Sequence, residues 1–141
     1  MAKAVIGWRE TVALPEWGIP SLKAKVDTGA RSSAIHVENL VELESGQIKF
    51  DVVMDRRHKH LHVQVQTKVA RVSQVKSSNG ETIKRYFVKT NLILGDLEKT
   101  VEISLANRDT MKVRMLIGRS ALGEDFLVDP HRTNLVERRR P

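Results

Sequence analysis

A short segment of this chain joins an acidic side chain to residues that build a rigid turn. An apolar strand residue, Val26, leads into Asp27-Thr28-Gly29, and the small residue Ala30 follows. Glycine allows positive φ or close approach of a substrate, and a Thr hydroxyl can hydrogen-bond nearby backbone groups and lock a turn. Two carboxyls that share one proton can activate water for hydrolysis. Asp27 is therefore a candidate catalytic residue, with Thr28, Gly29 and Ala30 as the turn that holds it.

The number of such turns limits how this chemistry could work. The chain has one Asp-Thr-Gly, so a symmetric dimer would have to supply the second carboxyl. Aspartic peptidases present their catalytic carboxylate in an Asp-Thr-Gly turn that follows an apolar strand residue. An alternative is a plain Asp-x-Gly turn between two strands, because Asp and Gly both favour turns.

The composition bounds the class of protein. The chain has 141 residues, of which 40% are hydrophobic and 29% are charged, and it has no cysteine. These values predict a single globular domain over residues 1–141. No apolar run approaches the roughly 20 residues of a membrane-spanning helix, and no signal-peptide pattern precedes Trp8. We therefore expect a cytoplasmic protein without disulfides, thiolate metal sites or a cysteine nucleophile.

The charge balance indicates which partners are compatible with this chain. The formal net charge is +7, with a basic run at Arg138-Arg139-Arg140 and a cluster at Arg56-Arg57-His58-Lys59-His60. A basic balance favours an acidic partner, such as an acidic polypeptide. Single-stranded nucleic acid is a poor fit, because its bases stack on aromatic side chains and this chain has two Trp, one Tyr and three Phe.

Alternating polar and apolar residues predict an all-β fold. Period-two alternation is the signature of a strand, and turn signals fall between the segments at Ser45-Gly46, Asn79-Gly80 and Gly95-Asp96. Evenly spaced short strands indicate a small barrel or sandwich. The apolar positions that alternate are Ile48, Phe50 and Val52; Leu61, Val63 and Val65; Tyr86, Val88, Thr90, Leu92 and Leu94; and Val101, Ile103 and Leu105. One short helix is expected around residues 120–124.

A second segment, Met115-Leu116-Ile117-Gly118-Arg119, reads as an apolar strand that stops at a glycine. In one half of an aspartic peptidase such a strand crosses beside the aspartate turn and supports it. In isolation, the segment fits an ordinary buried strand with a glycine at its end better. Its position after the Asp27 turn, in the expected order, favours the first interpretation.

Several blocks together resemble the retropepsin-like proteins of bacteria and archaea that carry the label ATP-dependent zinc protease, of the type associated with ATP-grasp ligases. The resemblance implies a closed, mostly β acid-protease barrel with at most one or two short helices. It also implies a homodimer with one catalytic Asp in each subunit. The blocks that carry it are Lys23–His36, Ser77–Gly80, Arg85-Tyr86, Asn107–Met111, Met115–Leu122 and Phe126–Pro130.

The resemblance also assigns site residues. Asp27 is implied as the catalytic residue, and Gly118-Arg119 match the apolar-Gly-Arg segment of retropepsins. There the Arg pairs with an acid just after the turn, whereas Arg31 occupies that position here, so the same pair cannot form. Arg31, Gly118 and Arg119 are candidates for binding substrate or bracing the site. Arg108 is another, either as a solvated or turn-capping residue or as a brace of the cleft.

Neither part of the label has direct support in the residues. The chain lacks His-Glu-x-x-His and lacks a phosphate-binding Gly-x-x-x-x-Gly-Lys loop. The only metal candidate is His58-Lys59-His60-Leu61-His62, whose three His would share one face of a strand. Zinc also needs a further ligand and a fixed outer shell, so we interpret this segment as an exposed basic hairpin. We expect no metal and no cofactor.

Two classes of function follow. The first is an aspartic endopeptidase, active as a homodimer on an acidic or glutamate-tailed polypeptide, because relatives of this kind accompany ligases that append glutamate. The second is a non-catalytic binding module that regulates such an ATP-grasp ligase. Lys25 and Arg31 support the second, because cations near Asp27 favour two ionised carboxylates with no shared proton. A nucleic-acid-binding barrel would rest on net charge alone.

Overall fold

A computed structural model of the chain describes residues 3–54, 61–76, 79–107 and 112–136. Strands dominate these residues, and the one α-helix among them, α1 (Arg119–Leu122), is four residues long. Two single-turn 3-10 helices, Pro15–Trp17 and Glu44–Gly46, join strands. None of the helices in the described part has the length and apolarity needed to cross a membrane. The predicted all-β class is confirmed.

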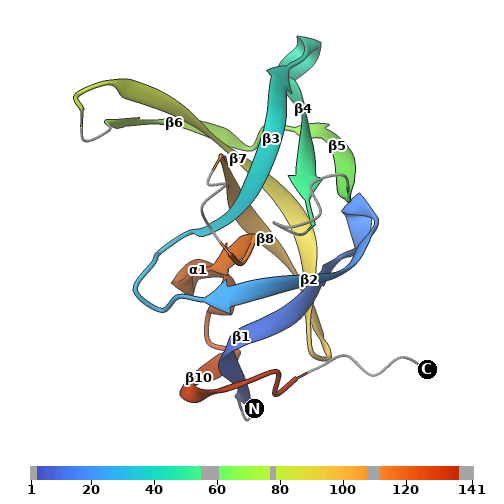
Figure 1. The fold of residues 1–141 in the computed structure, drawn as a ribbon, viewed down its shortest axis with the longest axis vertical. Coiled ribbons are helices and arrows are strands. Elements are labelled where there is room, and N and C mark those ends of the chain that lie inside the picture. The colour runs from blue at the N-terminus through green and yellow to red at the C-terminus, as the bar shows by residue number, and fades with distance from the viewer. Residues whose placement is uncertain (1–2, 55–60, 77–78, 108–111, 137–141) are drawn as a thin grey trace.

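The described residues form ten strands joined in one hydrogen-bonded sheet, and Figure 1 shows their arrangement. Their bounds are β1 (Ala4–Leu14), β2 (Ile19–Val26), β3 (Ser33–Glu42), β4 (Gln47–Val53), β5 (His62–Lys68), β6 (Arg71–Lys76), β7 (Thr82–Leu94), β8 (Leu97–Ala106), β9 (Met115–Ile117) and β10 (Phe126–Thr133).

The strand order brings distant parts of the sequence together. Hydrogen-bonded neighbours run β10-β1-β2-β9-β3-β8-β7-β6, and a further pairing of β1 with β7 closes a ring of strands. The short β9 lies between β2 and β3, parallel to β2 and antiparallel to β3. The two strands that flank the Asp27 turn are therefore both held by β9.

Most of the predicted alternation corresponds to real strands with one buried face. Ile48, Phe50 and Val52 of β4 are at most 1% exposed, and β7 and β8 pair across the tight turn at Gly95, which has φ +63°. The prediction was wrong for one residue of the alternating set. Leu61, predicted to alternate with Val63, precedes β5 and is 50% exposed.

Apolar side chains from almost every strand meet inside the ring. Ile6 and Leu14 of β1, Ile35 of β3 and Ile103 of β8 are at most 1% exposed, and Met115 of β9 is completely buried among them. Each fully buried side chain of this size contributes roughly 1.5–3 kcal/mol. The core therefore fixes β9 in place, and β9 in turn fixes the Asp27 turn.

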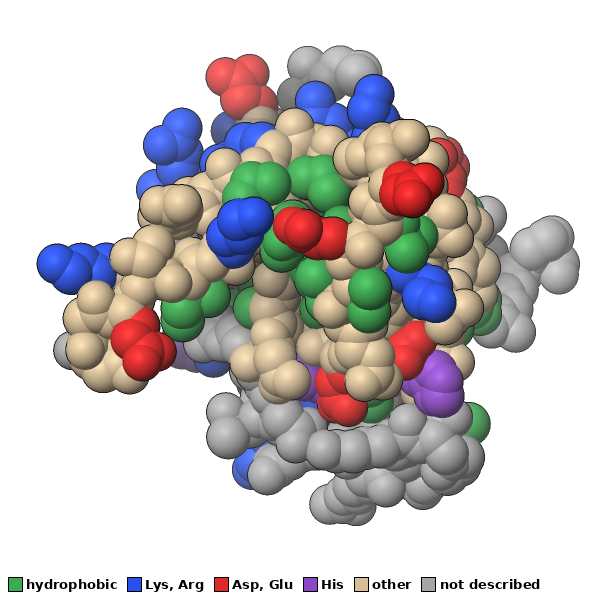
Figure 2. Space-filling view, turned by 90° about the horizontal axis from the view of Figure 1, so that it is seen from above, with side chains coloured by type: hydrophobic (Ala, Val, Ile, Leu, Met, Phe, Trp, Pro, Cys, Tyr) green, Lys and Arg blue, Asp and Glu red, His purple; other side chains and the backbone are tan. Residues whose placement is uncertain are grey.

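Two parts of the molecule project from this ring. In Figure 1 the β6–β7 hairpin extends to one side, while β3 and β4 rise at the top with β5 beside them. Seen from above, acidic and basic side chains are intermixed around an apolar centre (Figure 2). The positive charge of the chain is therefore not gathered on that face.

Candidate active site

Asp27 follows directly after the last residue of β2, beside the end of β9. Val26 is in register with Ile117, and the Asp27 backbone N–H donates to the Ile117 carbonyl oxygen at 2.9 Å. The strand beside the turn that the sequence predicted is therefore confirmed. This contact places a half-buried carboxyl at the end of two paired strands.

Backbone hydrogen bonds make the turn itself tight. The Ala30 N–H donates to the Asp27 carbonyl oxygen at 3.2 Å, and the Gly29 N–H donates to Asp27 Oδ1 at 3.0 Å. A Cβ added to Gly29 would lie 3.2 Å from that same oxygen, and Gly29 is not among the glycines with positive φ. A side chain at position 29 would crowd the carboxylate, so what favours glycine here is space and not a left-handed backbone.

The groups that hold the Asp27 turn do not include the Thr28 hydroxyl among the described residues. A Thr hydroxyl at this position can lock the turn, but among the described residues the Thr28 hydroxyl has no hydrogen-bond partner, and Thr28 is exposed. The turn is locked by backbone N–H groups and by Arg119 Nη1, which donates to the Thr28 carbonyl oxygen at 3.1 Å. Thr28 therefore leaves its hydroxyl on an open surface of the single subunit.

Gly118 and Ser33 connect β9 to the chain that leaves the turn. The Gly118 N–H donates to Ser33 Oγ at 3.1 Å, and both residues are buried. A Cβ on Gly118 would lie 2.6 Å from the carbonyl carbon and oxygen of Ser32, a distance that real Cβ atoms do not show. Only glycine allows the two backbones to come this close. Sequence reasoning singled out Gly118 but gave Ser33 no role, because a Ser at the start of a strand carries no distinctive pattern.

Two backbone hydrogen bonds join the chain that leaves the Asp27 turn to the start of α1. The Arg119 N–H donates to the Ala30 carbonyl oxygen at 2.8 Å, and the Ser120 N–H donates to that of Arg31 at 3.0 Å. Among the described residues Arg119 has no carboxylate partner, and its guanidinium donates to the Thr28 carbonyl oxygen. Arg119 braces the turn, whereas the Arg31 side chain is exposed.

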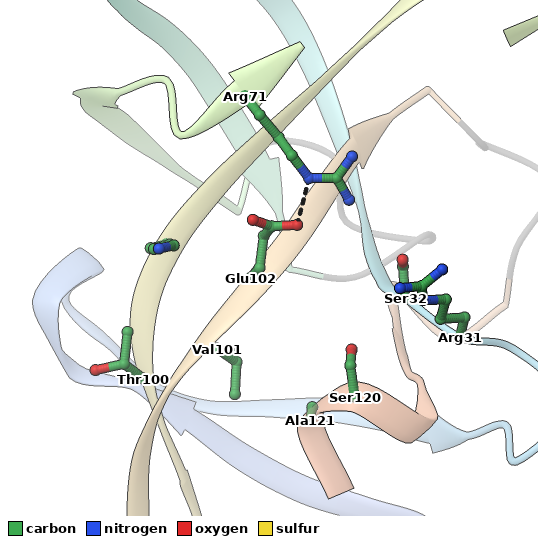
Figure 3. Close-up of a pocket in the computed structure, with 9 residues that line it drawn as sticks. Arg31, Ser32, Arg71, Thr100, Val101, Glu102, Ser120 and Ala121 are labelled. Atoms are coloured by element: carbon green, nitrogen blue, oxygen red, sulfur yellow. Dashed lines mark hydrogen bonds and ion pairs between the residues drawn. The ribbon is translucent and has the colours of Figure 1, made fainter. Parts of the chain in front are cut away.

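Arg31 lines a polar pocket beside the turn (Figure 3). The pocket has a volume of ≈ 620 Å³, and Asp27 does not line it. Its other charged residues are Arg71 at the start of β6, Lys89 in β7 and Glu102 in β8. Sequence reasoning missed these three, because each is an ordinary polar position on an alternating strand until the strands pair.

A contact outside the pocket ties the β6–β7 hairpin to the end of β3. The Tyr86 hydroxyl donates to the Glu42 carboxylate, and Lys84 Nζ lies 3.6 Å from the same group. The Tyr86 hydrogen bond and then the Lys84 charge lower the pKa of Glu42 from its usual value. The same bond raises the pKa of Tyr86.

Some candidate residues lie outside the described part of the chain. These include Arg108 and, in the predicted metal segment, His58 and His60. His62 begins β5 and is exposed. In the residues that the structure does describe, no group of three or more His, Asp or Glu side chains could hold a metal ion.

Comparisons with known proteins agree with this geometry. A family model described as the retropepsin-like aspartic endopeptidase RimB matches residues 5–139. The probable alpha-L-glutamate ligase of Shewanella pealeana is 39% identical over 131 residues, and the protein of that name from Parasynechococcus marenigrum is 34% identical over 131 residues. Each match covers 91% of this chain but only 29% or 28% of the relative. The chain thus spans less than a third of the length of these curated relatives.

A solved structure shows the same fold at a similar length. The crystal structure of Lpg0085 from Legionella pneumophila, a protein of unknown function, is 30% identical, with a TM-score of 0.79. The match covers 96% of this chain and 100% of the other. Together with the match to the family model over residues 5–139, this shows that the chain belongs to the RimB-like family of retropepsin-like aspartic endopeptidases.

Proposed function

We propose that the protein is an aspartic endopeptidase that acts as a homodimer, in which residues 1–141 form one domain and each subunit contributes Asp27. The observation that carries the proposal is the position of Asp27 at the joined ends of β2 and β9, where its carboxylate accepts the Gly29 N–H. A half-buried carboxyl at an exposed turn can face its copy across a twofold axis. Family membership supports the same chemistry.

The proposed reaction uses the two carboxyls in different protonation states. The ionised Asp27 takes a proton from a bound water, and the water oxygen attacks the scissile carbonyl carbon. The protonated Asp27 of the other subunit polarises the carbonyl oxygen. Collapse of the tetrahedral intermediate breaks the C–N bond, and a proton passes to the leaving nitrogen. Two carboxyls that face each other in one site cannot both ionise easily, so the pair shares one proton.

The open surface at the turn supports a dimer. Thr28 and Gly29 are exposed, and the Thr28 hydroxyl has no partner within the described part of one subunit. A second copy placed against this turn would cover these residues and bring the second Asp27 to the first. This also explains why one Asp-Thr-Gly in the chain is sufficient.

A second candidate is a binding module that regulates an ATP-grasp glutamate ligase. The observation that favours it is that the chain matches about 29% of larger relatives named probable alpha-L-glutamate ligase. Under this proposal Asp27 binds or positions a partner and cleaves nothing. Under the first proposal the same association makes glutamate-tailed polypeptides the first substrates to test.

The test is cleavage of a peptide mixture that includes glutamate-tailed peptides, followed by mass spectrometry across pH. Wild type, Asp27→Asn and the control Asp96→Asn, which changes an exposed carboxyl in the β7–β8 turn, run in parallel. We expect cleavage by wild type and Asp96→Asn, unchanged by a chelator, and none by Asp27→Asn. Cleavage by Asp27→Asn would overturn the proposal. No cleavage by any of the three would favour the binding module.

A further inference from the structure

One core-facing position next to the Asp27 turn holds a polar side chain. Ser33 begins β3 and is completely buried. Alternation along β3 places Ser33 on the same face as Ile35 and Val37, which belong to the apolar core, and its register partner in β8 is the buried Ile103. A buried hydroxyl costs free energy unless it is hydrogen-bonded. This position therefore calls for a specific use of the Ser33 hydroxyl.

The Ser33 hydroxyl and the Asp27 backbone are held by the same peptide unit, the one that joins Ile117 to Gly118. The N–H of this unit belongs to Gly118 and donates to Ser33 Oγ at 3.1 Å. Its carbonyl belongs to Ile117 and accepts the Asp27 N–H at 2.9 Å. Because a peptide unit is rigid and planar, its two polar groups cannot move independently. The direction of the carbonyl that holds Asp27 therefore depends on the bond to Ser33.

A second hydroxyl anchors Ser33 from the neighbouring strand. Ser104 of β8 is buried, and its Oγ donates to the Ser33 carbonyl oxygen at 3.2 Å. β8 runs parallel to β3 on one side and pairs with β7 along most of its length on the other. Ser33 is therefore supported by β8 through its carbonyl, and it supports the end of β9 through its hydroxyl.

The Ser33 hydroxyl differs from the backbone supports of the turn, because a substitution can delete it. The Arg119 and Ser120 N–H groups hold the Ala30 and Arg31 carbonyl oxygens through backbone bonds, which a change of side chain does not remove. Deleting the hydroxyl leaves a buried N–H without that acceptor, at the cost of desolvating the group. Ser33→Ala therefore tests this one support while the backbone bonds remain.

We propose that Ser33 is a positioning residue, which sets the place of Asp27 through the peptide unit between Ile117 and Gly118. The proposal rests on the proposed function, because a shared proton requires two carboxyls held at a fixed separation. A Ser33 that only stabilised the fold would lower the free energy of unfolding and leave the turn unchanged in molecules that remain folded. A positioning Ser33 alters the turn within the folded state.

The first measurement is amide hydrogen exchange by NMR, which does not depend on cleavage. The exchange rate of the Asp27 amide is compared with that of the slowest amides of β4 and β5, which report global opening. The control is Thr90→Val, which removes another buried hydroxyl, one that donates to Glu16 Oε1 beside the turn preceding β2. We expect Ser33→Ala to speed Asp27 exchange about tenfold more than exchange of the reference amides, the effect of one lost buried hydrogen bond. Thr90→Val should change both rates equally.

The second measurement is the split between kcat and KM for a cleaved peptide. We expect kcat to fall about tenfold in Ser33→Ala, because a catalytic group misplaced by about 1 Å can cost about 100-fold. KM should change less than about twofold, since substrate binding is not what the hydroxyl supports. Ser33→Cys keeps the size of the side chain with a weaker acceptor, so both readouts should lie between those of wild type and Ser33→Ala. It also carries the test if Ser33→Ala does not fold.

The outcomes separate this proposal from the proposed function. Equal acceleration of Asp27 and the reference amides in the Ser33 variants would overturn the positioning role, and so would an unchanged kcat. A rise in KM with kcat unchanged would also overturn it. If wild type cleaves nothing while Asp27 exchange responds as expected, the positioning role of Ser33 stands and the proposed peptidase activity does not.

Discussion

At the scale of single residues, the Asp27 turn depends on how closely two backbones approach. Gly29 lets its own N–H reach the Asp27 carboxylate, and Gly118 lets β9 lie against Ser32. A Cβ would crowd the Asp27 carboxylate at position 29, and it would clash with the backbone of Ser32 at position 118. Arg119 adds a hydrogen bond to the Thr28 carbonyl from the exposed side.

Gly118→Ala tests this close approach. The new Cβ would lie 2.6 Å from backbone atoms of Ser32, which cannot rotate away as a side chain can. We expect the free energy of unfolding to fall by about 3 kcal/mol, the upper end for overpacking, as measured by denaturant unfolding. The control is Gly80→Ala, where a Cβ meets nothing within 4 Å but φ is +87°. That variant should lose only about 1 kcal/mol from its backbone conformation. Equal losses in the two variants would contradict the account.

At the scale of elements, the hairpin is tied to β3 by Tyr86, Lys84 and Glu42. The hydrogen bond from Tyr86 lowers the pKa of Glu42, so the ionised carboxylate is the form that the folded state favours. Its stabilising contribution is present above the usual pKa of 4.5 and is lost as the pH falls through the lowered value. For Tyr86, whose pKa is raised above 10.0, the contribution is present below that pH and is lost as the pH rises through the raised value.

Tyr86→Phe removes the larger cause of the Glu42 shift. We expect the pKa of Glu42, followed by NMR titration of its side-chain carboxyl, to rise toward its usual value in this variant. Lys84→Gln removes the smaller, Coulombic cause and should raise the pKa less. A larger rise in Lys84→Gln than in Tyr86→Phe would show that charge, and not the hydrogen bond, controls Glu42.

The elements also show what a sequence can and cannot predict. Alternation at Ile48, Phe50 and Val52 predicted β4 because one face of that strand is buried. The pairing of Val26 with Ile117 joins residues that are far apart in the chain, and no local pattern encodes it. It was predicted only because the blocks around both residues resemble a known family. Arg71 and Glu102 come from different strands, and only the observed pairing brings their side chains together.

At the scale of the whole molecule, the ring of strands holds the Asp27 turn firmly from one side and leaves its other side open, as the proposed half-site requires. The buried core fixes β9, and β9 fixes the turn, yet Thr28 and Gly29 remain exposed. The polar pocket lies beside this open turn, toward the hairpin that begins at Arg71. Under the proposed function, the dimer would join two such turns into one cleft.

The most direct test of this account is a subunit-mixing experiment. Wild type and Asp27→Asn are mixed in equal amounts at fixed total concentration, and after subunit exchange the cleavage rate is compared with that of wild type. Analytical ultracentrifugation checks that both proteins and their mixture are dimers. If each active site needs two Asp27 residues, only dimers of two wild-type subunits are active, and the rate should fall to about a quarter. A rate of about half, proportional to the wild-type fraction, would mean that each subunit acts alone and would contradict the shared site.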